Sequence, residues 1–477
     1  MTALRTSAAR LAGEASVRAL RRLGRGGTAL PGLLLQTIDP GWIQEAAGRL
    51  TAGSVIITGT NGKTTTARLV AAMAAKAGYL VVHNAAGSNL ERGIAASLLS
   101  VMGADPQFES PDGRGTAPPV LGVFEVDEAS VPALVQHLRP RVVAFTNLFR
   151  DQLDRYGEVD AVAGRWRAAI RALDSQALLV LSADDPSVAG LGDGREALTF
   201  GLEERNLGHP GLEHAADARW CPRCGGELAY DWSFYGHLGH YRCPFCDFAR
   251  PTPTVAAEHV RLQGVSGSEL RLRAPWGMWE GPVPLPGLYN VMNVLAAVAT
   301  AQALGIPEGA VREALAGVTA AFGRGEVLDV WSRRVHLMLV KNPVGLSEVV
   351  RTIALEQGPL NVAMLLNDGI ADGRDVSWIW DADLEPLAGR LHRLVVAGHR
   401  AEDLALRLRA AGALPDPEVG RWWLEHGAKA ALRRALSVTP PGGRLFVLPT
   451  YTALLQSRTL LASWGGAQPF WAEAAAS

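Results

Sequence analysis

The chain has 477 residues, a formal net charge of -1 and 48% hydrophobic residues. This length predicts two or three domains, each with a core of its own, and the balanced charge disfavours a nucleic-acid-binding protein. No apolar run approaches the roughly 20 residues of a membrane span. The four cysteines lie within residues 221–246, which disfavours a disulfide scaffold and favours a reducing compartment, the cytoplasm.

Residues 1–50 are expected to form an N-terminal helical segment. Its first half repeats arginine among alanine and leucine and lacks the apolar block of a signal peptide, so it predicts a basic amphipathic helix. One interpretation is a solvated helix packed on its own domain. The other is a surface that rests on anionic lipid headgroups at the inner face of the membrane, with a basic side made by Arg10, Arg18, Arg21, Arg22 and Arg25.

Residues 51–322 are expected to form a central nucleotide-binding domain with a phosphate loop near its start. The string "GTNGKTTT" (59–66) lies between the apolar run "SVII" and an alanine-rich helix. Two residues separate its first glycine from the Gly-Lys pair, whereas the general phosphate-loop pattern has four. Glycines let backbone N–H groups approach phosphate oxygens, Lys63 adds a positive charge, and Thr64 can ligate Mg2+. We expect nucleotide contacts from Gly59, Thr60, Asn61, Gly62, Lys63, Thr64 and Thr65.

Three more apolar runs end in polar residues: 120–128, 141–158 and 177–186. Stretches with helical spacing separate them, which predicts a parallel sheet covered on both faces, with ligands at the carboxyl ends of the strands. We expect Glu125 to hold Mg2+ beside the phosphates, ahead of Asp127 and Glu128; the alternative is a solvated strand end. The other polar residues at these ends are Thr146, Asn147, Asp184 and Asp185.

The stretch "LPGLYNVMNVLAAVATAQALGI" (285–306) predicts a helix near the end of this domain. Asn290 and Asn293 stand three residues apart on its first turn, where both amides could face an adenine edge. Helix capping is the alternative role of Asn290.

An insert at about residues 218–250 contains two Cys-x-x-Cys pairs, Cys221 with Cys224 and Cys243 with Cys246. Four thiolates suit tetrahedral Zn2+ in a closed structural site, so we expect a zinc ribbon rather than a redox centre. Its aromatic residues could stack on bases, but the insert carries only two arginines between its outer cysteines, and a structural role is favoured. Those aromatic residues are Tyr230, Trp232, Phe234, Tyr235 and Tyr241.

Residues 323–477 start a new alternation of strands and helices, which predicts a smaller C-terminal α/β domain. Arg324 lies at the junction, where an interdomain salt bridge is one possible role. The stretch "NDGIADGRDVSWIWD" (367–381) is unusual because it is an acidic loop with two tryptophans. From its residues alone it could be an Asx-turn covered by core aromatics.

Five short strings, taken in chain order, resemble the central domain of the Mur ligase family, which includes folylpolyglutamate synthase. The matching strings are "GTNGKTTT", "EVDE", "TNLFRDQLDRYG", "SADDP" and "GLYNVMNVLAA". Family members use ATP to make an acyl phosphate from a carboxylate, which an amine then attacks. The shortened loop is the family's own form. The resemblance implies Asn147, Asn290, Asn293 and Arg324 as further ATP contacts.

Within the family, the chain is similar to the MurT group, the synthetase subunits of lipid II isoglutaminyl synthases. The matching strings are "HNAAGSNLERGIAASLL", the four-cysteine insert, "KNPVGLSEVV", "NDGIADGRDVSWIWD" and "LPTYTALL". The likeness implies ATP-dependent amidation of the α-carboxylate of D-glutamate in the lipid II stem peptide, which gives D-isoglutamine. Ammonia would come from a GatD-type glutamine amidotransferase in a heterodimer. Asp375, with Asp372 second, would complete the partner's catalytic Cys and His.

Departures from amino-acid-adding Mur ligases keep other readings open. Gln152 and Tyr289 stand where those enzymes have His, and "RWRAAIRAL" (165–173) lacks their carbamylated Lys, so the magnesium ligands cannot be carried over completely. Only about 50 residues precede the loop, which disfavours a UDP-linked substrate. The alternatives are a single-chain ligase that adds an amino acid and a nucleotide-binding scaffold without chemistry.

Overall fold

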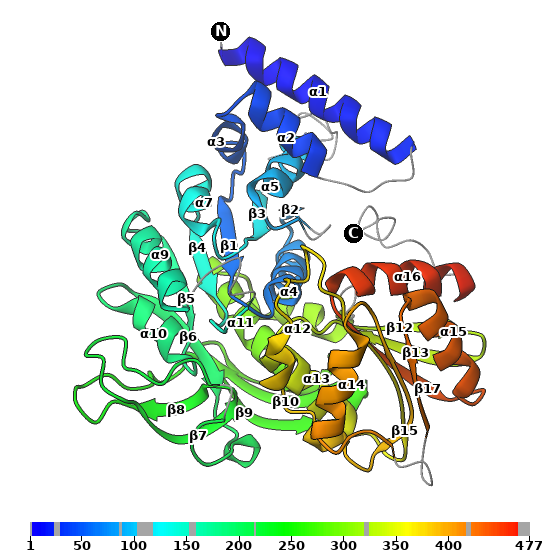
Figure 1. Ribbon diagram of the computed structural model, residues 1–477. Coiled ribbons are helices and arrows are strands. Elements are labelled where there is room, and N and C mark those ends of the chain that lie inside the picture. The colour runs from blue at the N-terminus through cyan, green and yellow to red at the C-terminus, as the bar shows by residue number, and fades with distance from the viewer. Residues whose placement is uncertain are drawn as a thin grey trace.

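The computed structural model describes residues 2–22, 29–84, 88–102, 118–151, 159–213, 216–318, 324–415 and 421–465 (Figure 1). Arg25 and Gln152 lie outside these ranges, as do the side chains of Arg21 and Arg324. Within the described ranges, no helix combines the length and apolar character of a membrane span.

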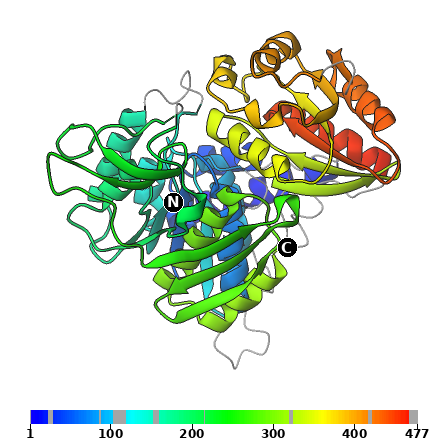
Figure 2. The same cartoon turned by 90° about the horizontal axis from the view of Figure 1, so that it is seen from below.

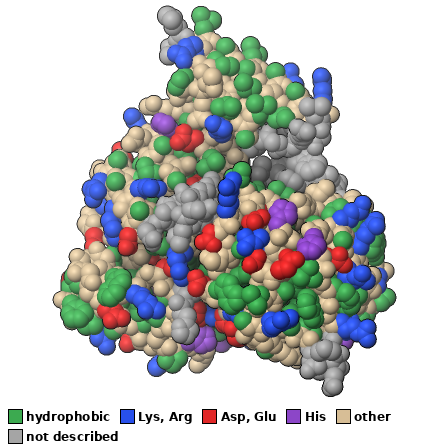
Figure 3. All heavy atoms as spheres, viewed as in Figure 1, with side chains coloured by type: hydrophobic (Ala, Val, Ile, Leu, Met, Phe, Trp, Pro, Cys, Tyr) green, Lys and Arg blue, Asp and Glu red, His purple; other side chains and the backbone are tan. Residues whose placement is uncertain are grey.

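Three helices form the N-terminal part: α1 (Thr2–Arg22), α2 (Ala29–Ile38) and α3 (Trp42–Ala47). Gly13 of α1 packs against Leu35 of α2, because a Cβ at Gly13 would lie 2.8 Å from the Leu35 Cδ2 atom. The outer side of α1 exposes Leu4 (78%) and Leu11 (59%), and hydrophobic side chains are spread over this end of the molecule (Figure 3). The helix therefore packs on its own domain through one side, and the role of its outer side at a lipid surface stays a prediction.

The central domain holds a nine-stranded sheet in the order β11-β10-β9-β6-β5-β4-β1-β3-β2. The strands from β2 to β9 in this order pair in parallel, as predicted, while β10 and β11 are antiparallel. A two-residue link joins β10 to β11, and so short a link permits only antiparallel pairing. The strands are β1 (Ser54–Thr58), β2 (Leu80–His83), β3 (Val120–Glu125), β4 (Val142–Phe145), β5 (Leu178–Ser182), β6 (Ala197–Leu202), β9 (Val255–Leu262), β10 (Ser268–Ala274) and β11 (Gly277–Val283).

Helices cover both faces of this sheet. Along β1, Val55 and Ile57 belong to one core and Ile56 to the other, since successive side chains of a strand point to opposite faces. The helices are α4 (Lys63–Lys76), α5 (Glu91–Ser97), α6 (Leu99–Met102), α7 (Val131–Leu138), α9 (Val159–Arg171), α10 (Pro186–Ala189), α11 (Leu288–Leu304) and α12 (Glu308–Gly317), with 3-10 turns η2 (Gly190–Gly192), η3 (Arg205–Leu207) and η4 (Gly264–Ser266).

The cysteine-containing insert lies between β6 and β9 and forms a hairpin of β7 (Ala229–Tyr235) and β8 (Leu238–Arg242). The chain leaves the central sheet after β6 and returns as its parallel neighbour β9. The insert therefore extends the chain without interrupting the sheet.

The C-terminal domain has a six-stranded sheet in the order β12-β13-β17-β14-β15-β16, with β12 antiparallel to the rest. Trp331 and Ser332 link β12 to β13 with positive φ angles, as a tight hairpin turn requires. Its elements are β12 (Arg324–Val330), β13 (Arg333–Met338), α13 (Pro343–Ala354), β14 (Leu360–Leu365), η5 (Ser377–Trp380), η6 (Glu385–Leu387), β15 (Leu391–Ala397), α14 (Ala401–Ala410), β16 (Arg421–Glu425), α15 (Ala428–Val438), β17 (Arg444–Pro449) and α16 (Tyr451–Gly465).

The C-terminal domain lies beside the central domain (Figure 2). The Asn342 side chain, at the N-terminus of α13, donates to the Asn61 Oδ1 atom of the phosphate loop over 3.0 Å. The two α/β domains, with an insert in the first, confirm the predicted fold class. The domain limits at residues 50/51 and 322/323 stay predictions.

Candidate active site and metal centre

The phosphate loop lies between β1 and α4, and its glycines are required by space. Gly59 and Gly62 have φ angles of 135° and 88°, which side-chain-bearing residues rarely adopt. A Cβ at Gly59 would lie 2.1 Å from the Thr146 Oγ1 atom, and one at Gly62 would lie 1.9 Å from the Asn293 Oδ1 atom. The loop can therefore approach its neighbours only without side chains at these two positions.

The segment that follows β4 holds the loop in place. The backbone N–H of Thr60 donates to the Asn147 carbonyl over 3.0 Å, and that of Asn61 donates to the Asn147 Oδ1 atom over 2.8 Å. The Thr146 hydroxyl donates to the Asn61 carbonyl over 2.8 Å. Asn147 thus binds the loop through both its backbone and its amide, and its direct contact with a nucleotide stays a prediction.

Lys63 is the first residue of α4, and its ammonium group is buried in an acidic pocket. It donates to the Glu128 Oε2 atom over 2.9 Å and to the Gly59 carbonyl over 2.5 Å. Burial acts to lower the pKa of Lys63, but the charges of Glu128, Glu125 and Asp127 outweigh it and raise this pKa. The acidic string after β3 therefore keeps the lysine charged. Sequence reasoning missed Glu128 as its partner.

Glu125 ends β3 and is buried beside two asparagines that the sequence did not single out. Asn84 accepts the N–H of Glu125 over 2.9 Å and donates to its carbonyl over 2.8 Å, and the Asn89 amide lies 3.5 Å from its Oε1 atom. Asn84 therefore fixes the backbone of Glu125, and only Asn89 lies near its carboxylate. The Glu125 carboxylate and the half-buried Thr64 hydroxyl offer oxygen atoms of the kind that Mg2+ prefers.

A narrow cleft with a volume of about 50 Å³ lies between the phosphate loop and the C-terminal domain, beside the contact of Asn342 with Asn61. Asn293 and Tyr289 of α11 line it, whereas the buried Asn290 donates to the Pro286 carbonyl and accepts from Asn293. The Asn61 Nδ2 atom is buried here without a hydrogen-bond partner among the described atoms. An unpaired donor beside a glycine loop fits a polar ligand such as a nucleotide.

Two charged residues of the C-terminal domain also line this cleft, and sequence reasoning missed both. Lys341 forms an ion pair with Asp151, which follows the loop-holding segment. Glu348 forms an ion pair with Arg351 at 3.0 Å, and burial raises the pKa of Glu348 to about 7. Arg351 also binds Glu213, which precedes the cysteine insert, at 2.7 Å. Charged contacts therefore connect both domains around the cleft.

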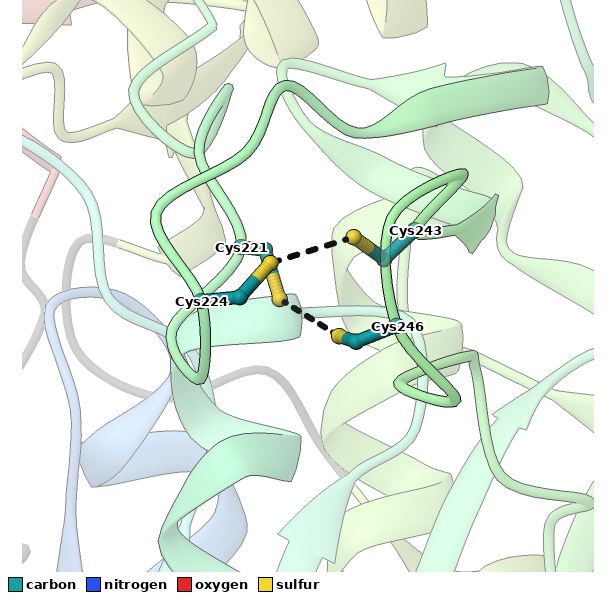
Figure 4. Close-up of side chains that lie close together, drawn as sticks. All are labelled: Cys221, Cys224, Cys243 and Cys246. Atoms are coloured by element: carbon teal, nitrogen blue, oxygen red, sulfur yellow. Dashed lines mark hydrogen bonds between the residues drawn. The ribbon is translucent and has the colours of Figure 1, made fainter.

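The four cysteines converge as the spacing predicted (Figure 4). Their sulfur atoms all lie within 4.8 Å of one another, with 3.6 Å between Cys221 and Cys246 and 3.5 Å between Cys224 and Cys243. Zn–S bonds of about 2.3 Å in a tetrahedron place sulfur atoms about 3.8 Å apart. The cluster is therefore compatible with a metal site.

The aromatic residues of the insert pack into the protein. Phe234, Tyr235 and Tyr241 are buried, the Tyr241 hydroxyl donates to the Ala183 carbonyl over 3.0 Å, and Trp232 stacks on His240 at 4.1 Å between ring centroids. The three buried rings offer no surface on which bases could stack.

The two candidate aspartates of the acidic loop (367–381) lie in different environments. Asp372 is buried and accepts hydrogen bonds from the N–H and the hydroxyl of Thr452, at 2.7 and 2.5 Å. Asp375 is exposed and accepts the N–H of Ser377 over 2.8 Å, in the Asx-turn that its residues also allowed. Hydrogen bonds from Ser377, first from its side chain and then from its N–H, lower the pKa of Asp375. Asp375 thus presents an ionised carboxylate at the surface, whereas Asp372 closes the loop.

Comparison with known proteins places this architecture in a family. Residues 57–219 match the Mur ligase middle domain, and residues 339–454 match the MurT ligase C-terminal domain. The chain is 33% identical to the lipid II isoglutaminyl synthase (glutamine-hydrolyzing) subunit MurT of Streptococcus pneumoniae, over 96% of this chain and 98% of that one. The chain belongs to the MurT family. The MurT subunit of Staphylococcus aureus strain COL is 31% identical over 83% of this chain and 85% of its own.

Solved structures show the same fold. The MurF ligase of Thermotoga maritima in complex with ADP is 13% identical, with a TM-score of 0.61 over 91% of this chain and 84% of that chain. The fold and the family confirm the resemblance to Mur ligases and make this chain an ATP-dependent ligase of the Mur type. The individual nucleotide contacts, including Arg324, stay predictions.

Glu348 generates a prediction about stability and pH. Its pKa is raised from 4.5 to about 7 in the folded protein, so the unfolded chain releases this proton at a lower pH, and the free energy of unfolding falls as pH rises from about 4.5 to 7. This shift lowers the free energy of unfolding of the parent at pH 8 by an amount on the order of 3 kcal/mol relative to its value below pH 4.5. We expect Glu348→Gln to abolish this pH-dependent loss of stability. Thermal unfolding at pH 5 and pH 8 measures it. The exposed Glu313→Gln should behave like the parent, and an equal pH slope in Glu348→Gln and the parent would contradict the assignment.

Proposed function

We propose that the chain is the ATP-dependent synthetase subunit of a lipid II isoglutaminyl synthase. It would amidate the α-carboxylate of D-glutamate in the lipid-linked stem peptide to D-isoglutamine. The observation that carries this proposal is the 33% identity over 98% of a relative with that name. The glycine loop at the start of α4 and the cleft that both domains line support it, because such loops bind phosphate groups and ligand sites are common at domain interfaces.

In the proposed reaction, a carboxylate oxygen of the substrate attacks the γ-phosphorus of ATP, and ADP leaves. Ammonia then attacks the acyl carbon, phosphate leaves with the bonding electrons, and the nitrogen passes one proton to the released phosphate, which gives the amide. The chain contributes alignment and charge neutralisation. Lys63, now paired with Glu128, would turn toward the phosphates, and the loop N–H groups would bind their oxygens. Thr64 and Glu125 would hold Mg2+, which neutralises phosphate charge when bound.

Ammonia has to come from a second protein if the four cysteines hold metal, because the chain has no other thiol for glutamine hydrolysis. We infer a GatD-type glutamine amidotransferase as the partner. Asp375 suits the role of orienting a catalytic His across the interface, since its carboxylate is exposed and ionised. Asp372 is bound to Thr452 and cannot reach outward without opening the loop.

The proposed amidation predicts the mass of the product. With ATP, lipid II, glutamine and a co-purifying amidotransferase, the stem peptide should lose about one mass unit, as a carboxyl becomes an amide. Lys63→Ala should abolish this change because the γ-phosphate loses its countercharge, whereas Lys76→Ala, on the same helix but exposed, should retain it. A mass gain of one amino-acid residue without the partner would instead identify a single-chain ligase. If no mixture gives a product, the chain is a nucleotide-binding scaffold without chemistry, and the proposed function is wrong.

The interface role of Asp375 has its own test. Asp375→Asn should suppress glutamine hydrolysis by the amidotransferase in the complex at least about tenfold, because an amide stabilises an imidazolium less well than a carboxylate does. ADP binding should stay unchanged. Glu402→Gln, which neutralises an exposed acid of α14, is the control. Parental glutamine hydrolysis in an intact Asp375→Asn complex would rule out this role.

We propose that the cysteine cluster holds structural zinc. Metal analysis of the purified protein should find about one zinc per chain, and treatment with a strong chelator should lower the midpoint of thermal unfolding, since the metal cross-links the insert. A folded chain with no bound metal would contradict this assignment.

A further inference from the structure

The turn between β7 and β8 reaches the polar ends of the central strands. It consists of Gly236, with a φ of 58°, and His237, which is fully buried. A Cβ at Gly236 would lie 2.9 Å from the Phe149 Cε1 atom and 3.5 Å from the Val344 Cγ2 atom. The tip of the cysteine-containing insert is therefore packed between the central domain and α13 of the C-terminal domain.

His237 contacts two segments that follow central strands. Its ring centroid lies 4.6 Å from that of Phe149, and its Nε2 atom lies 3.2 Å from the Oδ2 atom of Asp185, which is also fully buried. The same Asp185 oxygen accepts the N–H of Leu148 over 2.8 Å. His237 therefore bears on the Asn147–Phe149 segment directly through Phe149 and indirectly through Asp185.

That segment holds the phosphate loop. The Thr60 hydroxyl accepts the N–H of Phe149 over 2.9 Å and donates to the Phe149 carbonyl over 3.1 Å, next to the bonds that Asn147 makes with Thr60 and Asn61. Buried contacts thus run without a gap from the hairpin turn through Phe149 to the loop. Tyr235, which precedes the turn, lines the cleft itself.

We propose that the Gly236–His237 turn is a positioning element of the nucleotide site. By holding Asn147–Phe149 against Thr60 and Asn61, it keeps the loop in its binding conformation before ATP arrives, so that less ordering is required on binding. A two-stranded hairpin is only marginally stable in water, and a metal at its base would keep the turn in place. The metal cluster then serves nucleotide binding as well as stability.

The inference rests on the proposed nucleotide site and is tested first with ADP alone. Gly236→Ala adds a methyl group against Phe149, and the affinity for ADP should fall about tenfold. The matched control is Gly211→Ala, which has a similar positive φ of 73° and no atom within 4 Å of the added Cβ. It should bind ADP within about twofold of the parent. Both variants should carry the parental amount of zinc and unfold at similar temperatures.

A second pair separates positioning from mere packing. His237→Gln removes the ring from Phe149, whereas His240→Gln removes the other histidine of the same hairpin, which stacks on Trp232. In the amidation assay the first should raise KM for ATP about tenfold with kcat nearly retained, and the second should change neither. If the parent binds no ADP, the proposed function fails. If the parent binds ADP and folded Gly236→Ala and His237→Gln match it, only the positioning role is overturned.

Discussion

The candidate nucleotide site depends on a steric constraint at two glycines. Gly59 and Gly62 have no room for a Cβ because Thr146 and Asn293 occupy that space. The absence of side chains lets the loop lie against α11 and within hydrogen-bonding distance of Thr146 and Asn147. Lys63 follows Gly62 directly at the start of α4, and Gly62 and Asn293 both line the cleft beside the loop.

Buried charge is the second constraint. A lone ammonium group at the position of Lys63 would be costly to bury, and the acids of the "EVDE" string compensate for it. Glu128 takes the position of a counterion, so a bound phosphate would exchange one anion for another at Lys63. The backbone of the neighbouring Glu125 is held by Asn84, and its carboxylate lies 3.5 Å from the Asn89 amide.

The cleft is a product of three parts of the chain. The phosphate loop and α11 form one wall, α13 of the C-terminal domain forms the other, and Tyr235 of the insert completes the lining. Charged contacts span these parts, with Lys341 bound to Asp151 and Arg351 bound to Glu213. The position of the C-terminal domain and that of the insert are therefore coupled to the geometry of the loop.

The sequence by itself determined the phosphate loop, the parallel strands with polar ends and the four-cysteine cluster, because these depend on short spacings that local geometry translates directly into structure. Tertiary structure decided what depends on distant segments. It paired Lys63 with Glu128, placed Asn293 rather than Asn290 at the cleft, and exposed Asp375 while burying Asp372. It also brought His237 to Phe149, a contact between residues 88 positions apart in the sequence. Spacing specifies which groups a segment carries, whereas packing against other segments decides which way each group faces.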